Sequence, residues 1–510
     1  MKKILNIILV FIGLAGLSSC EEFLDRSPIS DLDPQNFFRS ESEIRSATLN
    51  IYTYMDDLRM LRLEQYSDNC FGRKNKNAIA YTYGTHTPSL GIFEETWSEN
   101  YQGIAQANLV INAEIGEDVS DDLFNSYVGD AYFMRAWYYS DLLFLFGEVP
   151  IVTDAPSVTG DIFPAKSSID DVKQQIINDL DEALKYLPVD PEKGRASIGA
   201  AQMLKAKTHI FMSEFEDAKD AAKAVIDLQK YELFDDFREL FYEESENTNK
   251  EVIFAIQFVA SLRPSSFYQK IVNSSRFAIC LELANLYEME DGTAIDDPNS
   301  GYDPQKPYLN RDPRYRVTIL TPGDSRTIDG VETPLIGRTT ASITAMIGDK
   351  YKNWDKDYSV YNGSDYILMR YADALLLYAE ALNEVSSSPG TEVYDAVDQV
   401  RARVGLPGLP AGLSKDVMRT RIRNERRKEL AMESQRLFDI FRWDIGDEAY
   451  NGTFDGYNQS KLDDLNNLVF EIATDLDPNR NYDPERGYFW PIPQTEIDVN
   501  ENLVQNPGYN

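Results

Sequence analysis

The sequence predicts a mainly α-helical protein in which paired helices form a scaffold, interrupted by long loop-rich inserts and a few short β-strands. Two observations lead to this fold class. From Glu41 to about Leu240, and again after residue 366, apolar residues recur every three or four positions with polar faces between them. From roughly Thr248 to Tyr366, the periodicity gives way to short β-like pieces and turn-rich connections.

The chain begins with a basic and then apolar segment. Lys2 and Lys3 precede the apolar run Ile4–Leu17, which is the layout of a secretion signal. This run of about fourteen residues is shorter than the roughly 20 that a membrane-spanning helix needs. The sequence LSSC then ends at Cys20 and resembles the lipobox of bacterial lipoproteins. We therefore expect residues 1–19 to be a signal peptide and Cys20 to carry a lipid anchor.

Two stretches of the first block indicate the type of helix packing. The stretch Asp122–Pro150 has an acidic start, an aromatic stripe and a glycine near its end, and it predicts a buried helix. Further on, Ala206, His209, Phe215 and Ala218 reproduce the small-large-large-small spacing of a tetratricopeptide helix pair. The spacing places the histidine at a core position, where a structural role is expected rather than a catalytic one.

The last block repeats this arrangement. The segments 371–384 and 393–405 read as another helix pair, and residues 419–443 predict one more long helix with charges of both signs. Within the long helix, four charged residues recur at helical spacing and favour a structural ion-pair network over an active site: Arg426, Arg427, Glu429 and Glu433.

The inserts are the expected ligand-binding parts of the chain. The strand-like EVIFAIQF and a long segment with Asp-Pro and Gly turn signals fall in the second insert, 248–366, and a shorter insert spans Asn69–Leu90. Long loops on a rigid scaffold commonly carry binding residues. Because helices and inserts are interleaved, we predict one mature domain, 20–510, with a first part at about 20–240 and a last part at about 367–510.

Composition excludes several functional classes. The formal net charge of −34 disfavours nucleic acid as a partner. The chain has only two histidines, and Cys70 and Cys280 have no zinc-type spacing, so we expect buried free thiols and no metal site. HExxH, GxSxG and phosphate-binding glycine loops are absent from the sequence. No catalytic residues and no cofactor are predicted.

Eight motifs occur in a fixed order along almost the whole sequence and together resemble the SusD/RagB family of surface lipoproteins. They are CEEFLDRSP, WSENYQGIAQANLVI, AYFMRAWYYSDLLFLFGEVPI, NRDPRYR, MRYADALLLYAEALNE, VRARVGLP, ERRKELAMESQRLFDIFRW and WPIPQTEIDVNENLVQNPGY. The resemblance implies a SusD-like α-α superhelix and a non-catalytic, nutrient-binding role. It also implies an outer-membrane location facing the cell exterior, and a TonB-dependent transporter of the SusC type as partner.

Candidate ligand contacts follow from the chemistry of oligosaccharides. Sugars present flat C–H faces bordered by hydroxyls, so their sites combine aromatic rings with amide, carboxylate or guanidinium groups. The inserts and the helix beside the first of them are rich in such residues. The predicted ligand-binding residues are Arg73, Tyr81, Tyr83, Trp97, Asn100, Tyr351 and Trp354.

Three functions remain open from the sequence. The first is a surface lipoprotein that binds glycans and delivers them to its transporter. The second is a related lipoprotein that takes up peptides, and the third is a lipid-anchored glycoside hydrolase with a carboxylate pair. Binding to a panel of polysaccharides, followed by analysis for new reducing ends, would separate the three.

Overall fold

The computed structural model describes residues 38–509 except 56, 117–118, 155–162, 266–276, 329, 335–341, 355–361, 463 and 465. The predicted signal peptide and Cys20 lie outside this part of the chain. Within it, none of the helices has both the length and the apolar character required to cross a lipid bilayer.

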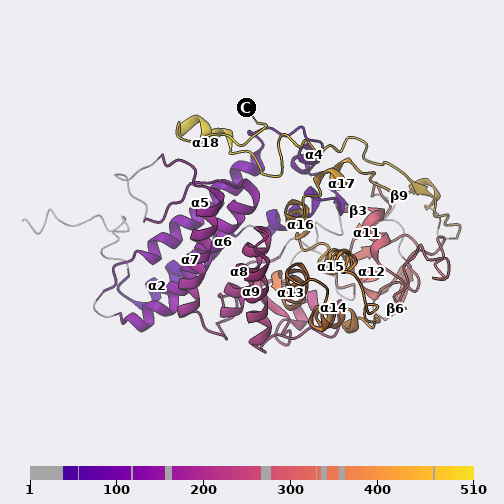
Figure 1. Ribbon diagram of the computed structural model, residues 1–510, viewed down its shortest axis with the longest axis horizontal. Helices are drawn as coiled ribbons and strands as arrows, with labels where there is room; N and C mark the ends of the chain where they lie inside the picture. The colour runs from indigo at the N-terminus through magenta and orange to yellow at the C-terminus, as the bar shows by residue number, and fades with distance from the viewer. Residues whose placement is uncertain are drawn as a thin grey trace, which may run out of the picture.

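The helices form the array of packed pairs that the sequence predicts, which confirms the fold class. In Figure 1 the helices of the first block lie side by side, and α13, α14 and α15 continue the array beyond α8 and α9. Helix α13 packs against α9, α14 and α15, so the two halves of the scaffold are continuous. The pairs are built from α2 (Glu41–Ile51), α5 (Gly91–Ile111), α6 (Asp121–Phe146), α7 (Ile169–Tyr186), α8 (Ile198–Phe211), α9 (Phe215–Asp227), α13 (Tyr371–Val385), α14 (Thr391–Arg403) and α15 (Lys415–Glu429).

Serine side chains fix where several of these helices begin. The hydroxyl of Ser120 accepts a hydrogen bond from the backbone N–H of Leu123 at the start of α6, and Ser168 and Ser197 do the same for α7 and α8. Such caps satisfy backbone donors that have no partner inside the helix. At the other end of α6, Gly147 adopts a φ of 76°, a conformation that glycine reaches without strain.

Shorter elements connect and cover the array. They are α3 (Asp57–Arg62), α4 (Lys76–Thr82), α11 (Leu281–Leu286), α12 (Pro313–Thr318), α16 (Arg436–Trp443), α17 (Gly446–Asn451) and α18 (Gln494–Val499), and the 3-10 turns Tyr52–Tyr54, Leu63–Tyr66, Glu239–Phe241, Glu243–Ser245 and Gln459–Lys461. In Figure 1, α18, α4 and α17 follow one another from left to right along the upper side of the molecule.

The strands tie the inserts to the scaffold. Strand β2 (Val252–Ile256), at the start of the second insert, pairs antiparallel with β8 (Tyr366–Arg370) at its end. The first insert joins the second through a sheet with the order β1-β3-β7-β4. The remaining strands are β1 (Cys70–Phe71), β3 (Ala278–Ile279), β4 (Ile319–Leu320), β5 (Ser325–Ile328), β6 (Val331–Pro334), β7 (Ile347–Gly348), β9 (Gly456–Tyr457) and β10 (Ile472–Ala473).

A network of buried charges joins α15 to the second insert. Glu429 accepts hydrogen bonds from Arg314 (2.8 Å), Arg370 (2.6 Å) and Arg403 (2.5 Å), and its side chain is fully buried. Burial alone would raise the pKa of the neighbouring Glu425, but Arg314 and other cations outweigh it and hold the pKa at about 2. The structural interpretation of the charged residues at 426–433 is confirmed.

The same network corrects the prediction of one long helix over 419–443. Helix α15 ends at Glu429, α16 begins at Arg436, and Met432 and Ser434 between them have positive φ angles of 68° and 59°. The Lys350 ammonium donates hydrogen bonds to the carbonyl oxygens of Glu429 and Ala431, 2.8 and 2.9 Å away. These carbonyls are therefore satisfied without a further helical turn.

Candidate functional site

The core beneath the edge of α4, α17 and α18 is built from aromatic rings. Trp490 is 0% exposed, and its ring centroid lies 5.0 Å from that of Phe93 and 5.7 Å from those of Tyr66 and Phe146. Its backbone N–H donates to the carbonyl of Leu145, 2.6 Å away. This tryptophan therefore fastens residues 477–509, which we call the C-terminal segment, to the end of α6.

Three predicted ligand residues belong to this core. Trp97 is 4% exposed and packs edge-on against Phe146, and Tyr81 is buried beside Trp490. The Asn100 amide donates to the Asp141 carboxylate (2.7 Å) and so links α5 to α6. Their role as ligand contacts stays a prediction, and in this structure their side chains are occupied by packing and by protein hydrogen bonds.

Trp97 also forms part of a cavity of about 390 Å³. The cavity lies between α5, α18 and the segments that contain Pro150 and Phe163, and the ring of Tyr101 lies 5.0 Å from the Trp97 ring. Its surroundings include the exposed apolar side chains of Phe163 and Val499.

Tyr351 and Trp354 lie in the second insert, beside the buried charges. The Tyr351 hydroxyl donates to the Met432 carbonyl (3.2 Å), and its ring is buried. Trp354 is half-buried, and its indole N–H donates to the Asp349 carboxylate (3.0 Å). The Lys352 ammonium lies 3.1 Å from the centre of the Trp354 ring, so one face of that ring is covered.

Arg73 and Tyr83 are the predicted residues of the first insert that reach the surface. Arg73 is exposed in the turn between β1 and α4. Tyr83 follows α4 directly, is half-buried, and donates its hydroxyl proton to the Asp477 carboxylate, 2.5 Å away. The bond brings the end of the first insert next to the C-terminal segment.

A ladder of four rings, which the sequence analysis missed, joins this C-terminal segment to α16 and α17. Tyr482 and Tyr488 are half-buried, and their ring centroids are 5.3 Å apart with an interplanar angle of 28°. Tyr450 of α17 extends the ladder beyond Tyr482 at 6.4 Å, and Phe441 of α16 extends it beyond Tyr488 at 5.3 Å. We call these four rings the tyrosine ladder.

Polar groups border the two partly exposed rings of the tyrosine ladder. The Asp444 carboxylate accepts a hydrogen bond from the Tyr488 hydroxyl (2.6 Å), and the Asn451 amide oxygen accepts one from the Tyr482 backbone N–H (2.8 Å). Burial, followed by the bond to Asp444, raises the pKa of Tyr488 above its usual value, so the phenol stays neutral. A Cβ atom on Gly446 would come within 2.6 Å of the Tyr482 ring, so glycine is required there.

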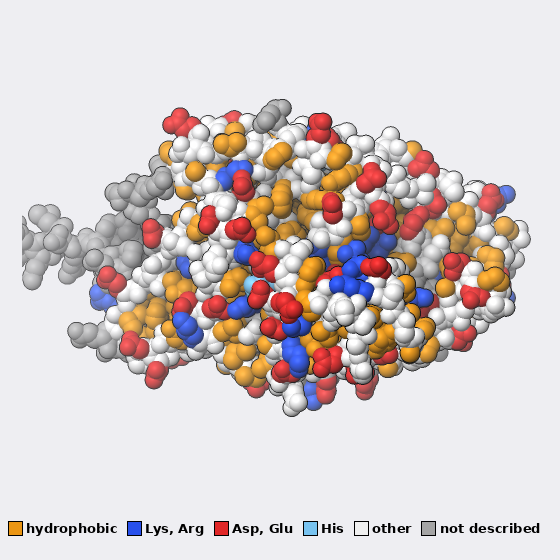
Figure 2. Space-filling model, in the orientation of Figure 1, with side chains coloured by type: hydrophobic (Ala, Val, Ile, Leu, Met, Phe, Trp, Pro, Cys, Tyr) orange, Lys and Arg blue, Asp and Glu red, His pale blue; other side chains and the backbone are white. Residues whose placement is uncertain are grey.

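The surface around these elements is mixed in charge. Figure 2 shows acidic side chains scattered over the face in view, with Lys and Arg side chains in small groups beside them. This face therefore offers no continuous basic surface of the kind that binds a nucleic-acid backbone.

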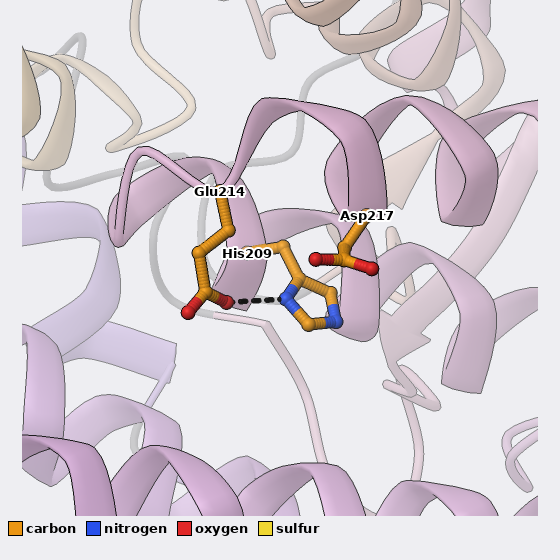
Figure 3. Close-up of side chains that lie close together, drawn as sticks. All are labelled: His209, Glu214 and Asp217. Carbon is orange, nitrogen blue, oxygen red and sulfur yellow. Dashed lines mark hydrogen bonds and ion pairs between the residues drawn. The ribbon is translucent and has the colours of Figure 1, made fainter.

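His209 occupies the structural position that its spacing predicts. It is buried near the end of α8, and its Nδ1 lies 2.7 Å from the Glu214 carboxylate at the start of α9, as Figure 3 shows. The bond spans the turn at Ser213, whose φ is 60°. Glu214 is also paired with Lys173 (2.5 Å), so although Asp217 lies close by, a cation already occupies this carboxylate.

The two remaining thiols are also located as predicted. Cys70 and Cys280 are free and buried. Cys70 donates toward the Glu64 carbonyl (3.4 Å), and the Cys280 sulfur accepts the Leu283 N–H at the start of α11 (3.3 Å). Burial raises the pKa of both thiols, which makes them poor nucleophiles.

Comparison with family models gives two matches. Residues 250–509 match the model described as "SusD family", and residues 22–208 match the model described as "Starch-binding associating with outer membrane". Together the two models account for most of the chain. The second description refers to starch binding and to the outer membrane.

Known proteins of the same type match over nearly their full length. "SusD-like protein P2" of Formosa agariphila is 27% identical, with 100% of both chains covered. "Starch-binding protein SusD" of Bacteroides thetaiotaomicron is 23% identical over 98% of this chain and 90% of the relative. A solved "SusD-like carbohydrate binding protein" of Bacteroides fragilis superimposes with a TM-score of 0.81 and 25% identity, covering 92% of this chain and 100% of that one.

The match to the family model covers half of the sequence, and the relatives align from end to end, in agreement with the helical array described above. The chain belongs to the SusD family.

Proposed function

We propose that this protein captures oligosaccharides at the cell surface and passes them to a SusC-type TonB-dependent transporter. The observation that carries the proposal is the half-buried ring pair of Tyr482 and Tyr488, bordered by Asp444 and Asn451. The parts of these neutral phenol rings that the neighbouring rings leave uncovered supply apolar surface for sugar C–H groups, while carboxylate and amide groups bind hydroxyls. The names of the Bacteroides thetaiotaomicron and Bacteroides fragilis relatives support this ligand class.

The proposed binding surface combines residues from both inserts and the C-terminal segment. Tyr83 is held against the C-terminal segment through Asp477, and Arg73 lies exposed ahead of α4. Trp354 offers a further half-buried ring in the second insert. We assign the first contact with a glycan to the tyrosine ladder and treat these three residues as additional contacts.

Replacing both Tyr482 and Tyr488 by alanine is expected to weaken glycan binding about tenfold or more. Each ring–sugar contact is assigned the roughly 0.5–1.5 kcal/mol that a contact between two aromatic rings contributes beyond its buried area, and the variant removes two such contacts. Retention on affinity gels that contain a panel of polysaccharides measures the effect. Tyr186→Ala serves as the matched control because Tyr186 is a half-buried tyrosine on α7, in another element.

The panel also decides between the proposed function and its rivals. Retention without new reducing ends supports binding alone. New reducing ends would show catalysis and overturn the proposal in favour of a hydrolase, and failure of the wild-type protein to bind any glycan would favour peptides. Unchanged retention of the double tyrosine variant would remove the tyrosine ladder from the binding site.

The proposed location is the outer membrane, with the lipid on Cys20 and the binding surface facing the exterior. A Cys20→Ala variant is expected to lose palmitate labelling and to move from the membrane fraction to the soluble fraction, since two or more acyl chains are what hold such a protein at a bilayer. The amount of transporter that co-purifies with the Cys20→Ala variant should also fall. Persistence of the label in the Cys20→Ala variant would contradict the anchor.

A further inference from the structure

We propose a second saccharide site, separate from the tyrosine ladder, in a polar cavity between the turn that precedes α8 and the strand pair β2–β8. The cavity measures about 340 Å³, and the polar residues that the argument uses are Lys193, Tyr242, Glu246, Asn249, Gln257 and Asp365. It shares no residue with the tyrosine ladder. The inference rests on the ligand class of the proposed function.

Two carboxylates and one ammonium group form the polar centre of this cavity. The Lys193 ammonium lies 2.8 Å from a Glu246 oxygen and 3.4 Å from an Asp365 oxygen. The lysine side chain is 54% exposed, whereas those of Glu246 and Asp365 are only 17% and 8% exposed. The lysine therefore lies at the solvent side of a sheltered carboxylate pair.

The backbone holds the two carboxylates in place. The backbone N–H of Asp365 donates to Glu246 (2.9 Å), and the Asp365 carboxylate accepts the N–H of Phe258 (2.9 Å). Burial is the largest of the effects that raise the pKa of Glu246 and of Asp365. A carboxylate offers about four acceptor positions, so each group keeps capacity for a ligand hydroxyl.

The charges around the cavity favour a neutral ligand. Three basic residues, Lys193, Arg195 and Lys230, face three acidic ones, Glu192, Glu246 and Asp365. Three of these six residues are also paired outside the cavity: Arg195 with Asp130 (2.5 Å), Lys230 with Asp190 (2.8 Å) and Glu192 with Arg45 (2.6 Å). Lys193, Glu246 and Asp365 pair with one another. An anion or a metal cation would have to break these pairs, whereas a hydroxyl can donate to a carboxylate and accept from an ammonium or amide group.

The size and walls of the cavity suit a short saccharide. Its volume is at the lower end of the roughly 300–1,000 Å³ that small-molecule sites occupy. Tyr242 supplies a half-buried ring, fixed by the bond from its hydroxyl to the Lys352 carbonyl (3.0 Å). Asn249 and Gln257 add amide groups. Two glycan contacts on one anchored chain would raise the overall affinity for a long polysaccharide by avidity.

Chemical labelling of Lys193 tests the proposal directly. The full mature protein is acetylated with an amine-reactive ester, with and without millimolar maltotriose or laminaritriose, and each lysine is quantified by mass spectrometry. Acetylation of Lys193 should fall by about half when the saccharide concentration equals the Kd. Lys250 is the internal control because it is 63% exposed and paired with Glu232 (2.9 Å), outside the cavity. Its acetylation should not change.

Two variants make the test specific. The Glu246→Gln/Asp365→Asn double variant keeps the side-chain shapes and should lose the saccharide protection of Lys193. The Tyr482→Ala/Tyr488→Ala variant should keep it. If a saccharide still protects Lys193 in the tyrosine variant, the result supports a saccharide site in the cavity, even if the tyrosine ladder proves not to bind glycans.

The opposite results would overturn the inference. If wild-type protein is retained on glycan gels while no saccharide protects Lys193, the cavity is not a saccharide site and the proposed function stands. If protection occurs with phosphate or Ca²⁺ and not with a saccharide, the ligand class is wrong. If neither retention nor protection is seen, both the inference and the proposed function fall.

Discussion

Replacing Glu429 by alanine is expected to destabilise the protein by about 3–5 kcal/mol, because it removes the carboxylate that three buried guanidinium groups share and leaves a buried excess of positive charge. Arg314, Arg370 and Arg403 all donate to this carboxylate at 2.5–2.8 Å. A loss of this size is a large part of the roughly 5–15 kcal/mol that stabilises a typical protein. The free energy of unfolding, measured by denaturant titration, checks the prediction.

Glu182→Gln is the contrasting variant, because it removes an ion pair that is exposed. Glu182 lies 2.6 Å from Lys185 on α7, and the two side chains are 40% and 56% exposed. Exposed pairs contribute roughly 0–1 kcal/mol, so this variant should unfold almost like the wild type. Equal effects of the two substitutions would show that the buried network is not what stabilises the join between α15 and the second insert.

Replacing Trp490 by alanine is expected to cost about 3–5 kcal/mol and to loosen the C-terminal segment, as is usual for a large aromatic residue removed from a core. Its ring touches Tyr66, Phe93 and Phe146, and its carbonyl accepts the Asn506 amide (2.7 Å). Hydrogen exchange should therefore accelerate between Asp477 and Tyr509. Denaturant titration measures the stability change in parallel.

Trp490→Phe is the matched control, because it retains an aromatic ring and should cost markedly less than alanine. The alanine variant should also bind glycans less well, although Trp490 is buried, because Tyr488 is only two residues away. Unchanged exchange in the C-terminal segment of the alanine variant would contradict the role assigned to this residue as its attachment point.

Much of the scaffold could be predicted because its signals are local. The helical period of 122–150 matches α6, and the spacing of Ala206, His209, Phe215 and Ala218 matches the pair α8 and α9. Small and large residues at fixed intervals specify helix packing without reference to distant parts of the chain. The break between α15 and α16 could not be predicted, because it depends on Lys350, which lies far away in sequence.

The candidate site was harder to predict because tertiary contacts decide which rings stay exposed. Trp97 fits a sugar-stacking residue by its neighbourhood in sequence, yet Phe146 and the rest of the core cover it. Tyr482 and Tyr488 lie in a turn-rich stretch without periodicity, and their alignment depends on Gly446 of α17. Nothing in the local pattern distinguishes them from other tyrosines of the chain.

The antiparallel contact of β2 with β8 has a consequence for how such proteins diversify. Val252 lies opposite Arg370, so the backbone leaves the helical scaffold and returns to it at adjacent positions. Lengthening or shortening the segment between these points costs little closure entropy, and the helices on either side keep their places as long as Arg314 and Lys350 keep their bonds to Glu429. Related proteins can therefore vary the length of this segment, which contains Trp354, without rebuilding the helical scaffold.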